Sequence, residues 1–179
     1  MAQSPARLRD RGLPIWKQII VSGLYTGLAP IASGTVASAV ACLFFFIPGF
    51  DNLWVLLGAS LVAFVAGVKL ADDCEHVLGP DPSFVTLDEF AGQWLALASP
   101  AALFGAVAPD GITWVAISFF TFRAFDIAKI WPASALDRRP GGLGVMGDDM
   151  VAGLYANIIG HLIWFGLAWL GPLTGFLQQ

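Results

Sequence analysis

Apolar residues fill five long stretches of the chain, separated by short turns or by longer polar segments. The stretches are Thr35–Pro48, Leu53–Ala71, Phe90–Pro109, Ile112–Phe125 and Met150–Leu170. A helix needs about 20 residues to cross a bilayer, with a range of about 17–25. The second, third and fifth stretches are long enough. The first and fourth stretches are short, and to cross the bilayer they would need flanking residues, a thinner bilayer or protein neighbours. We expect about five spans, within a range of four to six.

The connections between these stretches differ in charge. Pro48–Asn52 and Pro109–Gly111 are tight turns with few charges, whereas Asp72–Glu89 and Asp126–Asp149 are long and polar. With five spans, both polar connections lie on the same side as the N-terminus. All nine Lys and Arg residues lie on that side or just inside it. Since basic residues favour the cytoplasmic side, we predict that the charged segments face the cytoplasm and that the C-terminus lies across the membrane.

The N-terminal region has its own pattern. We expect residues 1–14 to form a flexible cytoplasmic arm of a single domain that covers residues 1–179. Next, apolar side chains recur at helical spacing opposite Lys17 and Gln18, at Ile15, Trp16, Ile19, Ile20, Val21 and Leu24. This pattern fits a helix that lies at the membrane interface, and equally a helix packed within the bundle. The predicted fold class is an all-α, polytopic membrane bundle of about five transmembrane helices plus an N-terminal interfacial helix.

Composition agrees with a membrane protein. Hydrophobic residues make up 57% of the chain and charged residues 12%, and the mean hydropathy is +0.74. A soluble domain carries about 25% charged residues. No basic stripe with interleaved aromatic residues is present, so we do not expect a nucleic-acid partner. The two cysteines, Cys42 and Cys74, form neither a disulfide framework nor a metal motif.

Ten of the thirteen carboxylates lie in the two polar connections. A carboxylate beside a bilayer is costly unless it binds a cation, pairs with a base or faces water. Asp88 and Glu89 precede the third apolar stretch, and Asp148 and Asp149 precede the fifth. An acid in the first turn of a helix is also favoured by the helix dipole, but one acid would suffice for that. The two acidic doublets, with Asp126 nearby, therefore suggest a Mg²⁺ site, because hard cations prefer carboxylate oxygens.

Asp81 lies in an Asp-Pro-Ser turn that could fold it back toward Asp88. Another group of acids, Asp72, Asp73 and Glu75, directly follows the second apolar stretch. For that group we expect a solvated helix end.

Basic residues accompany the second polar connection. Arg123, Asp126 and Lys129 are spaced by three and share a helical face, so they form either a salt-bridge ladder or part of an anion site. Arg123 is the more informative, because an Arg within an apolar stretch usually serves an anion or a buried carboxylate. Beyond them, Gly141 and Gly142 begin a glycine-rich segment whose exposed N–H groups suit phosphate, although such a segment is often only a flexible turn.

Four segments in this order resemble the phosphatidylglycerophosphatase A family of membrane lipid phosphatases. They are GLAPIASGT (27–35), DPSFVTLDEFAGQW (81–94), FRAFDIAKIWP (122–132) and LDRRPGGLGVMGDDMVAG (136–153). The chain departs from the usual family pattern at Ser33, Ile130 and Gly147, which affects loop shape more than charge. The resemblance implies a Mg²⁺-dependent enzyme of the bacterial inner membrane. Such an enzyme removes the terminal phosphate of phosphatidylglycerophosphate at a site facing the cytoplasm, with this phospholipid and membrane lipids as partners.

The resemblance also implies roles for individual residues. Metal ligands would be Asp88, Glu89, Asp148 and Asp149. Asp81 or Asp126 would be an additional ligand or the general base, and Arg123 and Lys129 would bind and stabilise the phosphate. Further substrate contacts would come from Gly34, Thr35, Asp137, Arg138, Gly141 and Gly142. The alternatives are an ion-coupled transporter and a non-enzymatic assembly subunit. Charges crowded on one surface disfavour the first, and the cost of so many acids disfavours the second.

Overall fold

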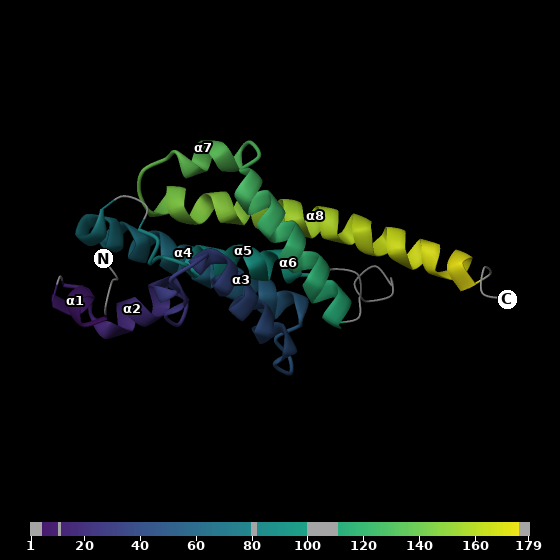
Figure 1. Cartoon of the computed structure of the whole chain (residues 1–179), viewed down its shortest axis with the longest axis horizontal. Coiled ribbons are helices and arrows are strands. Elements are labelled where there is room, and N and C mark those ends of the chain that lie inside the picture. Colours follow the sequence, from purple (N-terminus) through teal and green to yellow (C-terminus); the bar gives the residue numbers. More distant parts are fainter. Residues whose placement is uncertain (1–4, 11, 80–81, 100–110, 176–179) are drawn as a thin grey trace.

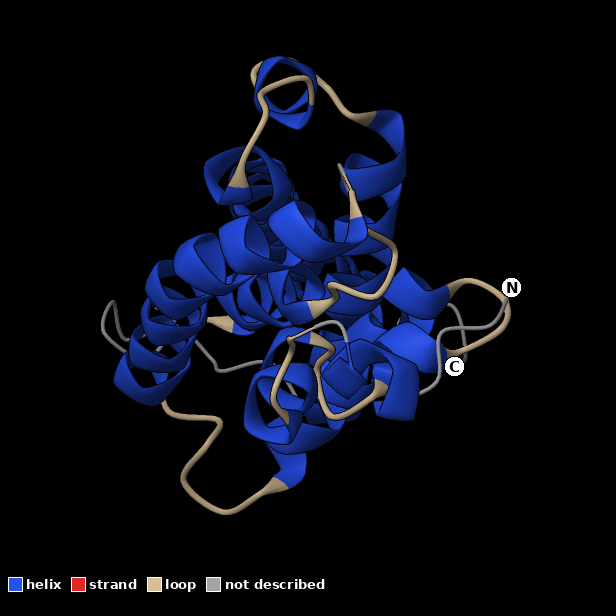
Figure 2. Cartoon of the chain, turned by 90° about the vertical axis from the view of Figure 1, so that its left-hand side faces the viewer, coloured by secondary structure: helices blue, strands red, loops and turns tan. Residues whose placement is uncertain are grey.

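The computed structural model describes residues 5–10, 12–79, 82–99 and 111–175. These residues form helices and the turns between them, with no β-strand among them, which confirms the all-α prediction (Figure 2). In chain order the helices are α1 (Pro5–Asp10), α2 (Ile15–Val21), η1 (Thr26–Leu28), α3 (Ser33–Leu43), η2 (Phe44–Phe46), α4 (Leu53–Leu78), α5 (Leu87–Leu97), α6 (Gly111–Ala128), α7 (Ala133–Asp137) and α8 (Gly142–Gly175).

Within the described part of the chain, three helices are long and apolar enough to cross a membrane. They are α4, α6 and the segment Gly142–Leu167 of α8. The expectation of about five spans is therefore only partly met. The stretch Ile112–Phe125, which seemed short, belongs to one of the three, because its helix continues to Ala128. In contrast, the first predicted span is a shorter apolar helix, Ser33–Phe46.

Helix α5 departs most from the expected pattern. The apolar stretch Phe90–Pro109 is long enough for a span, but its helix runs for 11 residues, from Leu87 to Leu97. Residues 100–109 of that stretch lie outside the described residues. Helix α5 is therefore a short helix surrounded by α3, α4, α6 and α8, and it contacts all four.

Side chains from α6 and α8 bind the carbonyl groups at the end of α5. Trp114 donates from Nε1 to the carbonyl oxygen of Leu97 at 2.8 Å. Asn157 donates from Nδ2 at 3.0, 3.2 and 2.6 Å to the carbonyl oxygens of Leu95, Ala96 and Ala98. In an apolar environment such carbonyls must find partners within the protein. These bonds explain how a helix can end inside the bundle.

Glycines bring the backbones of α5 and α8 into direct contact. A β-carbon at Gly153 would overlap the carbonyl oxygen of Gly92, and a β-carbon at Gly92 would overlap that of Asp149. Any larger residue would push the two helices apart. The contact lies about one turn from Glu89 and Asp149, so it brings the acidic doublets of α5 and α8 together.

The N-terminal helices pack against the end of α4 (Figure 1). Leu8 and Leu13 are buried there, so the described part of the predicted flexible arm is packed rather than free. On α2, Val21 is buried, whereas Ile15 and Trp16 remain 51% and 55% exposed. One face of α2 is thus packed in the bundle, and the other offers apolar side chains to a membrane surface.

Candidate active site

A cavity of about 410 Å³ lies where α3, α5 and α6 meet α7 and the start of α8. Nine residues with predicted site roles line it. They are Gly34, Asp88, Glu89, Asp126, Lys129, Asp137, Arg138, Asp148 and Asp149. Their positions extend over more than one hundred residues of sequence, and the helix bundle brings them together at one place.

The two acidic doublets enter the cavity from different helices. Asp88 and Glu89 occupy the first turn of α5, as predicted. Asp148 and Asp149 do not open their helix, because α8 already begins at Gly142. The prediction was wrong on this point, because the glycine-rich segment from Gly142 onward forms the start of α8 and does not precede the helix. Asp148 and Asp149 are therefore held by a formed helix and are 4% and 3% exposed.

Arg123 binds two of the buried carboxylates. Its Nη1 forms an ion pair with Glu89 Oε2 and lies 2.9 Å from Asp126 Oδ2. Ser38 adds a hydrogen bond of 2.8 Å from its hydroxyl to Glu89. Arg123 itself is not among the residues that line the cavity. It therefore neutralises and orients two carboxylates from behind the cavity wall.

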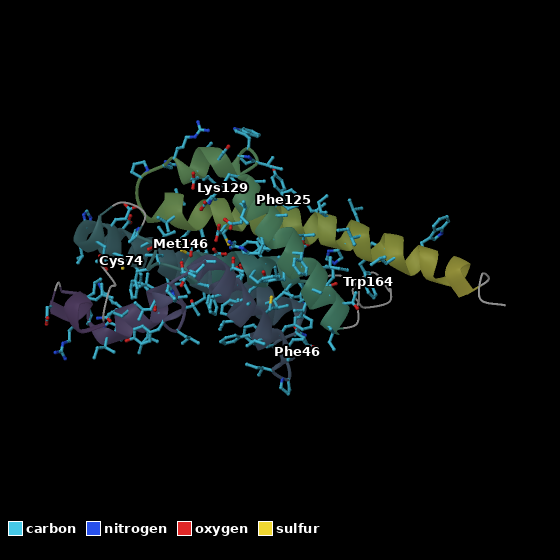
Figure 3. The ribbon with its side chains drawn as sticks, viewed as in Figure 1. Phe46, Cys74, Phe125, Lys129, Met146 and Trp164 are labelled. Atoms are coloured by element: carbon cyan, nitrogen blue, oxygen red, sulfur yellow. The ribbon has the colours of Figure 1, made fainter. Side chains whose placement is uncertain are left out.

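Lys129 joins three acidic side chains at the cavity. It pairs with Asp148 and lies 3.3 Å from Asp137 and 3.5 Å from Asp126. Figure 3 labels Lys129 between α7 and α8. Burial alone would lower the pKa of Lys129, but its hydrogen bond to Asp148 and the negative charges around it outweigh burial and raise the pKa. The spacing of Arg123, Asp126 and Lys129 thus produces a salt-bridge ladder that extends to α7 and α8.

Asp88 and Asp149 lack such partners. Neither forms an ion pair with a described residue. Asp149 also experiences the charges of four other carboxylates, those of Glu89, Asp88, Asp126 and Asp148. One oxygen of Asp148, Oδ1, is buried without a hydrogen-bond partner. Buried negative charge of this kind is costly unless a cation neutralises it.

Mg²⁺ is the ion that these carboxylates were predicted to bind. Their oxygens are the ligands that hard cations prefer, and Asp88, Asp148 and Asp149 face one cavity. However, the described residues contain no group of three or more His, Cys, Asp or Glu side chains already arranged to hold a metal ion. The charge and the ligand type therefore fit Mg²⁺, and the side chains would have to turn toward a common point to bind it.

The glycine-rich segment has other partners. The N–H of Gly141 donates to Glu75 at 3.1 Å, and the N–H of Gly142 donates to Asp72 at 2.5 Å. These N–H groups, predicted to hold phosphate, are thus bound to carboxylates at the end of α4. Neither glycine lines the cavity. Asp72 and Glu75 are not simply a solvated helix end, because they anchor the start of α8.

Some predicted residues lie elsewhere, and others were missed. Thr35 does not line the cavity, and Asp81 falls outside the described residues. Sequence reasoning missed Glu75, Ser33 and Thr86 as site residues and gave Arg139 no role of its own, although all four line the cavity. A signal existed for Arg139, because it directly follows Arg138 in one of the matching segments. Both arginines are exposed, and neither forms an ion pair with a described residue.

Comparison with known proteins agrees with these features. The family described as phosphatidylglycerophosphatase A matches residues 19–164. A protein of Escherichia coli named phosphatidylglycerophosphatase A is 32% identical over 87% of each chain. A Haemophilus influenzae protein of the same name is 29% identical over 79% of this chain and 84% of its own.

A third relative, from Bacteroides thetaiotaomicron, is provisionally named phosphatidylinositol-3-phosphatase. It is 33% identical over 84% of this chain and 93% of its own. No solved structure matches the chain significantly. The family match covers the helices that form the cavity, and it includes both acidic doublets and the cations between them. The chain belongs to the phosphatidylglycerophosphatase A family.

Proposed function

We propose that the protein hydrolyses the terminal phosphomonoester of phosphatidylglycerophosphate to phosphatidylglycerol and phosphate. One observation carries this proposal: a cavity that combines buried carboxylates with exposed cations lies at the ends of helices that can cross a membrane. The names of the Escherichia coli and Haemophilus influenzae relatives support the same substrate. A phosphatase that acts on a lipid requires this arrangement, because the acyl chains of the lipid stay in the bilayer while its phosphate enters a polar site.

Cations on two sides of the cavity would bind the phosphate. Arg138 and Arg139 lie on its exposed rim, where their guanidinium groups can bind phosphate oxygens in pairs. Lys129 lies deeper and is already shared by three acids. The predicted phosphate role of Arg123 is less well supported, because Glu89 and Asp126 occupy it and it does not line the cavity. We therefore assign Arg123 to positioning those carboxylates.

Mg²⁺ would be held by Asp88, Asp148 and Asp149, with Glu89 as the fourth carboxylate nearby. When bound, the ion would neutralise phosphate oxygens and lower the pKa of a bound water. Asp126 makes a poor general base in this arrangement, since Lys129 and Arg123 engage its two oxygens. Asp81 remains the predicted base. We also propose that the site faces the cytoplasm of the bacterial inner membrane, following the distribution of basic residues.

The decisive test is phosphate release by the purified full chain in detergent. We expect release from phosphatidylglycerophosphate with Mg²⁺ and none with EDTA. Asp88→Asn and Asp149→Asn should each lose activity by at least about a hundredfold if they hold the ion. Asp51→Asn, in an exposed turn between α3 and α4, is the matched control and should keep full activity. Full activity in both site variants would disprove the metal assignment.

The same assay tests the choice of substrate. Phosphatidylinositol 3-phosphate belongs in it because the Bacteroides thetaiotaomicron relative carries that name. A higher kcat/KM for this lipid than for phosphatidylglycerophosphate would replace the proposed substrate with it. Equal kcat/KM for p-nitrophenyl phosphate would show that the enzyme does not require a lipid at all.

A further inference from the structure

A second cavity, of about 330 Å³, is lined by apolar side chains. It is a groove between the α3–η2 segment and α6. From the first segment come Ala39, Cys42 and Phe46, and from α6 come Ile112, Ala116 and Phe119. Several of these side chains are exposed, including Phe46 at 52% and Ile112 at 76%. An open apolar groove of this kind suits a hydrocarbon ligand.

The groove and the polar cavity share the same two helices. On α3, Gly34 lines the polar cavity and Ala39 lines the groove, and five residues of helix correspond to about 7.5 Å. On α6, Asp126 lines the polar cavity and Phe119 lines the groove, seven residues or about 10 Å apart. Asp126 and Phe119 share one face of α6, whereas Ala39 lies about 140° around α3 from Gly34. The groove therefore lies about two turns from the polar cavity along the same face of α6.

A polar network separates the two cavities. Arg123 on α6 lies 3.4 Å from the hydroxyl of Ser38 on α3, and both bind Glu89. These residues stand between Gly34 and Ala39 on one helix and between Asp126 and Phe119 on the other. A lipid with its phosphate in the polar cavity would have its acyl chains on the groove side of this network.

The groove is shorter than one leaflet. From Ala39 to Phe46 the groove residues extend over seven residue steps, which corresponds to about 10 Å. Half of the hydrocarbon core of a bilayer is about 15 Å. The part of an acyl chain that lies in this groove would therefore remain within one leaflet.

We propose that the groove between α3–η2 and α6 binds an acyl chain of the lipid whose phosphate occupies the polar cavity. This inference rests on the proposed function and adds to it a subsite for the hydrocarbon part of the substrate. It assigns specificity to Ala39 and Ala116, whose small side chains leave the groove open. Selectivity for lipids over soluble phosphomonoesters then comes from α3 and α6 as well as from the polar cavity.

Filling the groove tests this assignment. Ala39→Trp and Ala116→Trp should raise KM for dioleoyl phosphatidylglycerophosphate about five- to tenfold with kcat nearly unchanged, because a uniform binding interaction is lost. The same variants should keep kcat/KM within about twofold for the dihexanoyl lipid, whose short chains do not reach the groove. Val62→Trp is the matched control. Val62 is 68% exposed on α4, outside the groove, and its replacement should change neither substrate.

Each outcome is decisive. Equal loss for the long-chain and short-chain lipids would overturn the inference, because the tryptophans would then disturb the polar cavity or the fold. Unchanged kinetics for both lipids would overturn it too, and a change of oligomeric state in those variants would assign the groove to a second copy of the chain. If the wild-type protein releases phosphate from neither lipid, the proposed function fails before the groove is tested.

Discussion

Gly34 on α3 lies directly against the carboxylate of Glu89 on α5, so that a β-carbon at position 34 would overlap Oε1. The same β-carbon would lie 3.3 Å from Arg123. A glycine is therefore required here by space and not by backbone conformation. This contact explains why a small residue is needed near the start of α3.

Gly34→Ala should displace Glu89 and reduce kcat about 10- to 100-fold, because small misplacements of catalytic groups are costly. Gly58→Ala, on an open face of α4 with nothing within 4 Å, should leave activity intact. Steady-state kinetics of both variants on the same lipid measure the difference. Normal kcat in Gly34→Ala would mean that the position of Glu89 is not critical.

Arg123→Gln should lower thermal stability as well as kcat. It leaves the buried carboxylates of Glu89 and Asp126 without their shared cation, which costs about 3–5 kcal/mol for a buried pair. KM should change less than kcat, because Arg123 does not line the cavity.

The double variant Arg123→Gln/Glu89→Gln should regain part of the lost stability, since one uncompensated charge is removed. In contrast, Arg138→Gln should mainly raise KM and leave the melting temperature unchanged. A larger rise of KM in Arg123→Gln than in Arg138→Gln would return Arg123 to the phosphate-binding groups.

Lys129 should remain charged throughout the alkaline range. Its pKa in the folded protein is raised above the ordinary value of 10.5, so its ion pairs stabilise the fold fully below that pH. This contribution is lost only as pH rises through the folded-state pKa. We therefore expect the pH–rate profiles of wild type and Lys129→Arg to have the same shape up to about pH 10.

Lys129→Met should lose both stability and activity across that whole range. A shift of the alkaline limb in Lys129→Arg alone would show that Lys129 titrates within the working range, contrary to this expectation.

Asp149→Asn should make the metal-free protein more stable while it abolishes activity. Asp149 is almost fully buried among other carboxylates, so removing its charge relieves repulsion. A gain of about 1 kcal/mol raises the melting temperature by about 2–4 °C in a chain of this size. Mg²⁺ should raise the melting temperature of wild type and have less effect on the variant. Equal stabilisation of both by Mg²⁺ would remove Asp149 from the ligands.

The short length of α5 leads to a prediction away from the chemistry. Asn157→Ala would remove the bonds of its amide to the carbonyls at the end of α5. The Leu95 and Ala96 carbonyls keep the Ala98 N–H and the Ser118 hydroxyl as partners, whereas the Ala98 carbonyl loses its partner, and an unpaired buried group costs about 1–3 kcal/mol. We expect a lower melting temperature with KM unchanged. Leu162→Ala on the same helix, where the side chain is 63% exposed, is the control. A wild-type melting temperature in Asn157→Ala would mean that the carbonyls find other partners.

The sequence predicted the helical class from local composition, and costly acids together with the family resemblance indicated most of the charged residues of the cavity. Apolar runs without charges indicate helices in a membrane, and acids beside such runs are costly enough to indicate a function. The number of spans was harder to predict. The length of an apolar stretch does not reveal where a helix ends, as α5 illustrates, since its end depends on Asn157 and Trp114 from distant parts of the chain.

Hydrogen bonds and ion pairs between residues on different helices could not be predicted from the sequence either. The Gly141 and Gly142 amides were expected to bind phosphate, but they bind Glu75 and Asp72, some seventy positions earlier. Such pairings depend on how α4 packs beside the start of α8. In the same way, Arg123 could be recognised as costly from its apolar neighbours, whereas its partner Glu89 became evident only in three dimensions.

The backbone contact between Gly92 and Gly153 affects how the enzyme responds to a change in bilayer thickness. A helix adapts to a thicker or thinner bilayer by tilting or bending. Helix α8 continues well beyond Gly153, so its distal part can follow the lipid while the segment that carries Asp148 and Asp149 stays fixed against α5. The distal part of α8 can therefore tilt about this contact without moving the carboxylates that precede it.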